Sequence, residues 1–144
     1  MLSHNILMNY YPLIASITSM VTSQTIKLGI MVYKKEPIKL AALTRSGGMP
    51  SSHSALITSI AASIGLSSGF HSTEFFIATV LSFVVIYDAR GIRHAVGTHA
   101  KALNTLQPTQ KPLNEEVGHT LPEIIIGIAI GLAVSLSMYQ FIYF

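Results

Sequence analysis

The chain has 144 residues, of which 50% are hydrophobic and only 10% are charged, whereas ordinary soluble domains carry about a quarter charged residues. This composition indicates contact with lipid, and the length predicts one domain over residues 1–144. A net charge of +3, without a stripe of basic and aromatic residues, gives no indication of nucleic-acid binding. The absence of cysteine excludes a disulfide scaffold, thiol catalysis and cysteine-ligated zinc.

Four apolar segments predict an all-α integral membrane protein, a bundle of about four transmembrane helices with a polar site at one membrane face. The segments are 6–26, 55–70, 75–87 and 121–144. The first and last are long enough for a hydrocarbon core of ~30 Å, whereas the middle two need their flanking turns. Helices are expected because backbone groups in lipid must be bonded internally. The N-terminal segment lacks the features of a secretory signal and is expected in the mature protein.

Two polar stretches, 27–54 and 88–120, separate these segments, and only a short link near His71 joins the middle two. Four crossings put both polar stretches on the same membrane face. The nine basic residues all lie in or beside them: Lys27, Lys34, Lys35, Lys39, Arg45, Arg90, Arg93, Lys101 and Lys111. The positive-inside rule therefore predicts a site at the cytoplasmic face of a bacterial-type inner membrane. Basic residues retained for ligand binding would produce the same pattern without reporting topology.

The stretch "GGMPSSHSA", residues 47–55, predicts a turn followed by a helix that begins near His53. Gly47 and Gly48 allow the backbone to approach a ligand closely, and Ser51 or Ser52 can cap the helix. The N–H groups at such a helix start form an anion site. An ordinary capped turn explains the same residues.

The last apolar segment begins with "GHTLPE", residues 118–123. His119 and Glu123 are four residues apart, so the carboxylate can hold one imidazole nitrogen and leave the other free to attack. Thr120 and Glu123 also fit a capping box, which is an alternative explanation of the same carboxylate.

Ionisable residues follow the third apolar segment in "YDARGIRHAVG", residues 87–97. Arg93 is the candidate here, because a guanidinium binds phosphate in a bidentate manner; an Asp88–arginine pair is the alternative. Ordinary snorkelling or surface roles explain Arg90, His94, His99 and Lys101. Lys27 alone would also be a snorkelling lysine, but the predicted sidedness places it with the other candidates. No His-Glu-x-x-His spacing occurs, and neither a metal site nor a cofactor is expected.

These motifs resemble those of the type 2 phosphatidic acid phosphatase superfamily, to which the vanadium haloperoxidases are related. "PSSH", residues 50–53, is similar to the family's Pro-Ser-Gly-His motif, and "GHTLPEIIIG", residues 118–127, is similar to its last motif. Together with "YDARGIRHAVG", they resemble most the small divergent membrane branch of that superfamily. The resemblance extends from about residue 23 to residue 131.

The resemblance implies a metal-independent phosphatase that works through a phosphohistidine. It implies that His119 is the nucleophile, that Glu123 orients it, and that His53 is the acid for the leaving group. The phosphate-binding residues that it implies are Lys27, Ser51, Ser52, Arg93 and Arg45. The family's Lys-x6-Arg-Pro pattern is not matched, so either Lys27 or the Lys39–Arg45 pair fills the first-motif role.

The sequence therefore favours a lipid phosphate phosphatase whose substrate is phosphatidylglycerophosphate, phosphatidate or a polyprenyl phosphate or diphosphate. A phosphorylated lipid is the expected ligand and a homo-oligomer the expected assembly. The alternative is a noncatalytic membrane module that binds anionic lipid or a protein partner through Lys34, Lys35 and Lys39. In that alternative, replacing His119 leaves function intact.

Overall fold

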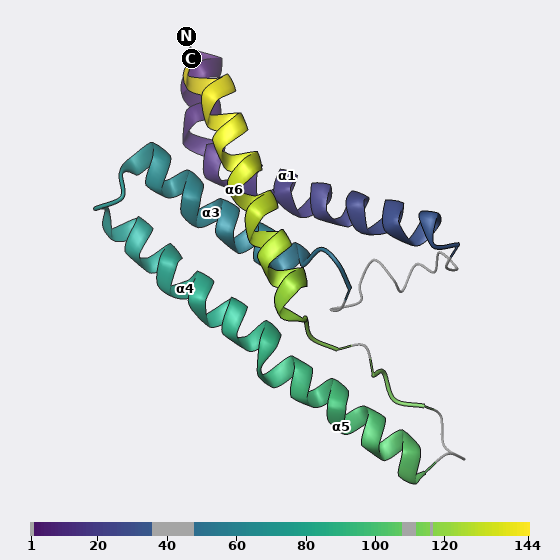
Figure 1. Ribbon diagram of the computed structural model, residues 1–144. Helices are drawn as coiled ribbons and strands as arrows, with labels where there is room; N and C mark the ends of the chain where they lie inside the picture. Colours follow the sequence, from purple (N-terminus) through teal and green to yellow (C-terminus); the bar gives the residue numbers. More distant parts are fainter. Residues whose placement is uncertain (1, 36–47, 108–111, 116) are drawn as a thin grey trace.

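The computed structural model describes residues 2–35, 48–107, 112–115 and 117–144. The regular structure of these residues is entirely helical, in the arrangement of Figure 1. The helices are α1 (Leu2–Tyr33), α3 (Ser52–Ser68), α4 (Thr73–Arg90), α5 (Ile92–Leu106) and α6 (Leu121–Tyr143). The candidate residues Lys39, Arg45 and Gly47 lie outside the described residues.

The predicted all-α membrane fold is confirmed. Each predicted apolar segment overlaps one helix, and α1, α3 and α4 begin before their segments because polar flanking turns continue the helix. Two helical stretches of the described chain, Thr73–Leu106 and Leu121–Tyr143, are long and apolar enough to cross a membrane. That the chain crosses the membrane four times stays a prediction.

Helix α5 was not predicted, because its residues fell in a stretch that looked merely polar. Its exposed apolar residues Ile92, Val96 and Leu103 recur at spacings of four and seven, which place them on one side of a helix. A search for continuous apolar runs misses such a helix. α5 continues α4 in nearly the same direction (Figure 1), and Gly91 lies between them.

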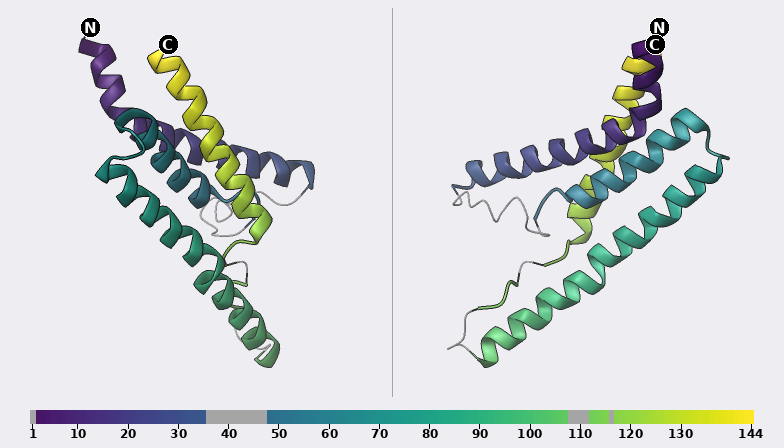
Figure 2. Two further views of the ribbon diagram at one scale, coloured as in Figure 1. Left: turned by 60° about the vertical axis from the view of Figure 1, so that its left-hand side comes forward. Right: turned by 180° about the vertical axis from the view of Figure 1, so that it is seen from behind.

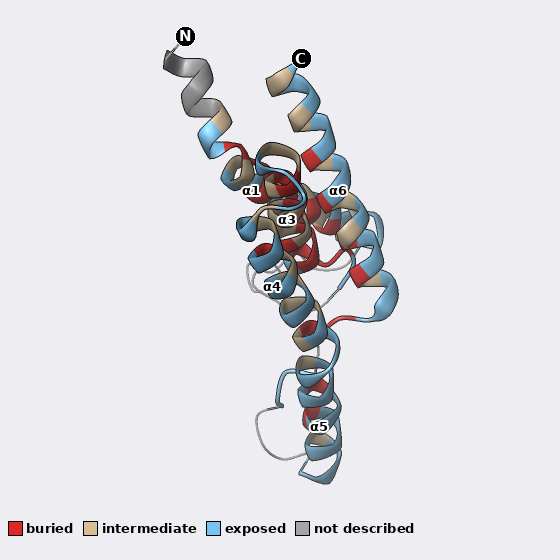
Figure 3. Ribbon diagram, turned by 90° about the vertical axis from the view of Figure 1, so that its left-hand side faces the viewer, coloured by how far each residue is buried: buried red, intermediate tan, exposed pale blue. Residues whose placement is uncertain are grey.

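Helix α3 is the centre of the bundle and contacts α1, α4 and α6. Figure 3 shows the buried residues gathered where α1, α3 and α6 meet. These contacts are made by small residues, which let helix backbones approach closely in lipid. Ser19 in α1 donates to the Ala55 carbonyl at 3.0 Å, and the Ser59 and Ser135 hydroxyls lie 2.8 Å apart between α3 and α6.

Both termini lie at the same end of the molecule, and the left view of Figure 2 shows them spread apart. The ring of Tyr11 is fully buried, lies 5.9 Å from those of Tyr139 and Tyr143, and its hydroxyl donates to the Ser135 carbonyl at 2.7 Å. α1 bends in its first half, where Pro12 lies inside the helix, and a proline removes an internal hydrogen bond there. These contacts hold α1 against α6 near the two termini. The packing therefore also sets how the end of α1 and the start of α6 lie relative to α3.

Gly131 offers a direct test of the α3–α6 contact. A Cβ at Gly131 would lie 2.5 Å from the Ala55 carbonyl oxygen and 3.1 Å from Ser59 N, and these backbone atoms cannot yield as a side chain can. We expect Gly131→Ala to lower stability by about 1–3 kcal/mol, measured as a lower melting temperature by circular dichroism in detergent. Gly29→Ala is the matched control, because nothing lies within 4 Å of its Cβ position. Equal losses in the two variants would contradict this packing.

Candidate active site

Three helix ends that are distant in sequence meet at one end of the bundle. Ser51 N, just before α3, donates to the carbonyl of Glu123 in the first turn of α6 at 3.0 Å. His119 N, just before α6, donates to the Ala89 carbonyl in the last turn of α4 at 3.0 Å. The two motifs that contain histidine are therefore joined through the backbone, independently of their side chains.

His119 and Glu123 form the predicted pair. Nδ1 of His119 lies 3.1 Å from Oε2 of Glu123, and because an ionised carboxylate can only accept, Nδ1 carries the proton. The same Oε2 accepts from Thr120 N at 3.0 Å. The sequence presented the capping box and the contact with His119 as alternatives. The carboxylate of Glu123 makes both contacts.

The other imidazole nitrogen of His119, Nε2, is buried and has no hydrogen-bond partner among the described residues. With the proton on Nδ1, Nε2 has its lone pair available. Burial lowers the pKa of His119 below its ordinary value, and the hydrogen bond and charge of Glu123 oppose that shift. The neutral form, which is the nucleophilic one, is favoured.

Gly118 explains how His119 reaches this position. Its φ of +90° lies in the region that favours glycine. A Cβ at this position would collide with the backbone nitrogen of His94 and lie 2.8 Å from the carbonyl carbon of Arg93. The chain can enter α6 against the start of α5 only with glycine before the histidine.

The start of α3 supplies the second histidine. The rings of His53 and His119 have centroids 6.3 Å apart, so the two imidazoles are neighbours at the site. Ser51 caps the helix, as predicted, by accepting from Ser54 N at 3.3 Å. The N–H groups of Ser52 and His53 have no acceptor within the helix, since they belong to its first turn.

The serine hydroxyls already have protein partners. Ser51 Oγ also accepts from the Ser54 hydroxyl at 2.9 Å, and Ser52 Oγ accepts from Gln24 Nε2 at 3.2 Å. Both serines are buried. Sequence reasoning missed Gln24, although it lies one helical turn before Lys27 and so shares its face of α1.

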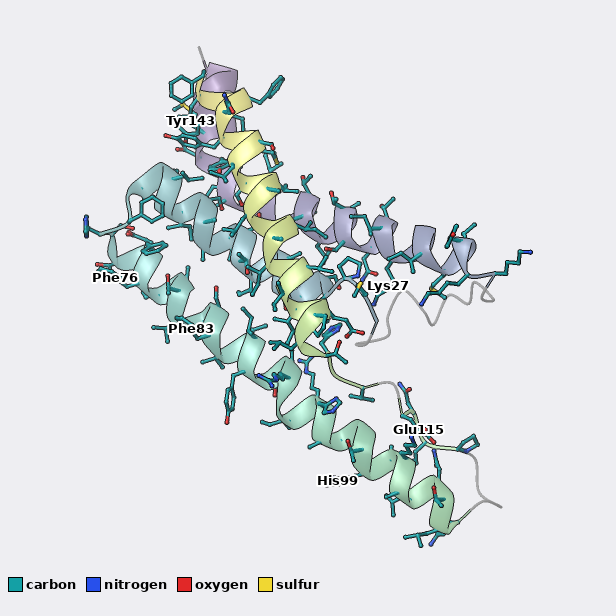
Figure 4. The ribbon with its side chains drawn as sticks, in the orientation of Figure 1. Lys27, Phe76, Phe83, His99, Glu115 and Tyr143 are labelled. Carbon is teal, nitrogen blue, oxygen red and sulfur yellow. The ribbon has the colours of Figure 1, made fainter. Side chains whose placement is uncertain are left out.

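Two cations lie close to the histidines. Lys27 is buried, with 6% of its surface exposed, and Figure 4 shows it extending from α1 toward the residues that begin α3. A Cβ on Gly48, whose φ is +87°, would lie 3.4 Å from Lys27 Cε and 3.8 Å from Nζ. Lys27 and Arg93 each lower the pKa of His119 through their charge. Both charges therefore act on the imidazole of His119.

Arg93 is held by an acidic neighbour. Its Nε donates to Oδ2 of Asp88 at 2.7 Å. The ion pair that the sequence offered as an alternative is therefore present, and Arg93 is its basic member. Arg90, His94, His99 and Lys101 are all exposed. Among the described residues, no three His, Asp or Glu side chains cluster so as to hold a metal ion.

Sequence comparison adds a family to this geometry. The model of the family described as "Divergent PAP2 family" matches residues 8–134. The chain belongs to the divergent PAP2 family. This relates it to a phosphatase superfamily, as the motifs around His53 and His119 implied.

A relative within the divergent PAP2 family is an uncharacterized membrane protein, YuiD, of Bacillus subtilis (strain 168). It is 27% identical over 154 residues, which cover 94% of this chain and 98% of the relative. No solved structure matches the chain significantly. The comparisons therefore support a membrane protein of a phosphatase-related family.

Proposed function

We propose that this chain is a metal-independent lipid phosphate phosphatase that forms a phosphohistidine at His119. The observation that carries the proposal is the state of that imidazole, whose Nδ1 is fixed by Glu123 while Nε2 has no partner in the described chain. A histidine that serves only packing has no need of an orienting carboxylate on one side and an unused lone pair on the other.

In the first proposed step, Nε2 of His119 attacks the phosphorus of a phosphate ester. A P–N bond forms, the bond from phosphorus to the leaving oxygen breaks, and His53 gives that oxygen a proton. Lys27 and Arg93 offset the negative charge on the transferring phosphoryl group. Glu123 stabilises the positive charge that develops on the imidazole through its contact with Nδ1.

In the second proposed step, water attacks the phosphohistidine from the side that the alcohol has left. His53, now neutral, takes a proton from that water, the P–N bond breaks, and inorganic phosphate leaves. The two histidines thereby return to their starting protonation states. The proposed proton and phosphoryl transfers use only His119, His53, the phosphate ester and water, and they call for no metal.

The position of the site favours a lipid substrate. It lies where α4, long and apolar enough with α5 to cross a membrane, gives way to Asp88 and Arg93 at the predicted boundary of the lipid. We propose a phosphorylated headgroup as the ligand, at the cytoplasmic face of a bacterial-type inner membrane. Because His119 Nε2 is buried, the phosphate must displace covering atoms as it enters.

The burial of Lys27 argues against the noncatalytic alternative. A module that binds lipid by surface charge uses exposed lysines such as Lys34 and Lys35, whereas Lys27 is buried beside the histidines. Placing a lysine there has a desolvation cost. An anion bound next to it would offset that cost.

The test is phosphate release by the purified full-length protein in detergent, with chelator present. The panel contains phosphatidylglycerophosphate, phosphatidate, and polyprenyl phosphate and diphosphate. We expect chelator-resistant release from at least one of them. Absence of release from the whole panel would refute the proposal, and release that chelator abolishes would refute its metal-independent chemistry.

The pH dependence of turnover tests the role of Glu123. Because burial lowers the pKa of His119 from 6.5, we expect the acid limb of kcat/KM below pH 6.5. Glu123→Gln keeps a capping residue but removes the charge that raises this pKa. We therefore expect its acid limb at lower pH than in the wild type, with a maximum of kcat/KM roughly 10²- to 10⁴-fold lower.

The two pH profiles are measured on the same substrate, so the ionisation of that substrate affects them equally. A difference in the pH of their acid limbs therefore comes from the protein. A limb that moves to higher pH in Glu123→Gln would contradict the assignment.

We also propose that the chain assembles into a homo-oligomer. α4 leaves large apolar side chains exposed on several sides, among them Phe76, Phe83 and Val84, and lipid or a second copy can cover them. Native mass spectrometry in mild detergent tests this proposal. Monomers alone would contradict it.

A further inference from the structure

We propose that Asp88 is a positioning residue that holds the guanidinium of Arg93 in the orientation that binds phosphate. This inference rests on the proposed function. It concerns the contact between Arg93 Nε and Asp88 Oδ2 at 2.7 Å, which joins the last turn of α4 to the first turn of α5 across Gly91.

Helix stability does not account for this pair. An acid in the last turn of α4 and a base in the first turn of α5 each lie at the end where the helix dipole disfavours their charge. The side chains of Arg93 and Asp88 are also 39% and 32% exposed, and exposed ion pairs add little stability. The pair therefore points to a role other than folding.

The geometry fits positioning. A guanidinium has N–H donors at Nε and at both terminal nitrogens, and the contact with Asp88 is made at Nε. The two terminal nitrogens can bind a phosphate in bidentate fashion. A carboxylate on Nε thus fixes the plane of the group without taking the place of the ligand.

The same turn of α4 also holds the proposed nucleophile. Ala89, next to Asp88, accepts the hydrogen bond from His119 N at 3.0 Å. The side chain of Asp88 holds the guanidinium of Arg93, and the carbonyl of Ala89 holds the backbone of His119. The same turn of α4 therefore fixes both groups relative to each other. A change at Asp88 releases the first of these contacts and leaves the second intact.

Binding of inorganic phosphate to the full-length protein in detergent, measured by isothermal titration calorimetry, tests the inference. Asp88→Asn removes a negative charge near an anion site, so electrostatics alone would strengthen phosphate binding. The neutral amide can offer Arg93 Nε only a weaker contact than the carboxylate, and we expect the less firmly held guanidinium to bind phosphate about tenfold more weakly. The two effects have opposite signs, so the result distinguishes them.

Three further variants complete the experiment. In an Arg93→Ala background no guanidinium remains to be held, so we expect Asp88→Asn to cause no further weakening. Asp88→Glu, which keeps the carboxylate, should recover part of the affinity. Glu74→Gln is the matched control, because it removes an exposed acid from the other end of α4, and we expect wild-type affinity.

Unchanged or tighter phosphate binding in Asp88→Asn would overturn the inference, as would equal weakening with and without Arg93. Absence of phosphate binding by the wild type would overturn it too. Phosphate binding without phosphate release from any lipid would refute only the proposed phosphatase and leave the role of Asp88 supported.

Discussion

Replacement of His119 by alanine is expected to abolish phosphate release, with a loss of roughly 10⁴- to 10⁶-fold in kcat, the range seen when an enzyme loses its nucleophile. The reason is that Nε2 is the nucleophile, and we expect no other side chain to take its position. Glu123 is not expected to substitute, because in the variant its Oε2 is still held by Thr120 N in the capping box. Phosphate release in detergent, followed on the best substrate of the panel, measures the loss.

A covalent intermediate makes this expectation more specific. Brief reaction with a substrate labelled in its phosphate, followed by quenching in base, should leave label on the wild-type protein. The label should be lost in acid, as a phosphohistidine is, and should be absent from His119→Ala. His71→Ala is the control, since His71 is exposed in the α3–α4 link and far in sequence from every site residue. Normal release by His119→Ala would refute the nucleophile.

Because His119 is fully buried, its replacement also tests the fold. His119 is among the largest side chains with almost no exposed surface, so alanine leaves a cavity that lowers stability. His119→Gln fills more of that space and lacks the nucleophilic nitrogen. Circular dichroism shows whether His119→Gln is folded. A folded His119→Gln variant without activity would separate the chemical role of His119 from its structural role.

Local spacing was enough to predict the pair at the start of α6. His119 and Glu123 are four residues apart, and the capping box that ties Glu123 back to Thr120 N brings the carboxylate close to His119. The cap at Ser51 is local in the same way. The locations of α1, α3, α4 and α6 were equally accessible, because a membrane forces long apolar segments to satisfy their own backbone.

Contacts between distant segments could not be predicted in this way. The Gln24 contact with Ser52 depends on how α1 crosses α3, and the contact of His119 N with Ala89 depends on where α4 ends. The polar face of α1 carried a signal, since Ser16, Ser19, Ser23 and Lys27 recur at three or four residues and are all buried. That spacing identifies a packed face but not the helix that packs on it.

Replacement of His53 by alanine is expected to have an effect that depends on the leaving group. An alkyl phosphate leaves as a strongly basic alkoxide that needs a proton, whereas a nitrophenyl phosphate leaves as a far weaker base. We expect first-turnover alcohol release from the alkyl lipid to fall by about 10²- to 10⁴-fold, the usual contribution of a general acid. First-turnover release of nitrophenol should fall by about tenfold or less.

The second step behaves differently, because water needs a base whichever alcohol has left. If His53 serves both steps, His53→Ala should release nitrophenol in a burst and then stall as the phosphohistidine, so the labelled intermediate should accumulate above its wild-type level. His99→Ala, a change of an exposed histidine on α5, should show neither effect. An equal loss with both leaving groups and no accumulated intermediate would mean that the His53 ring, 6.3 Å from that of His119, shapes the pocket without moving a proton.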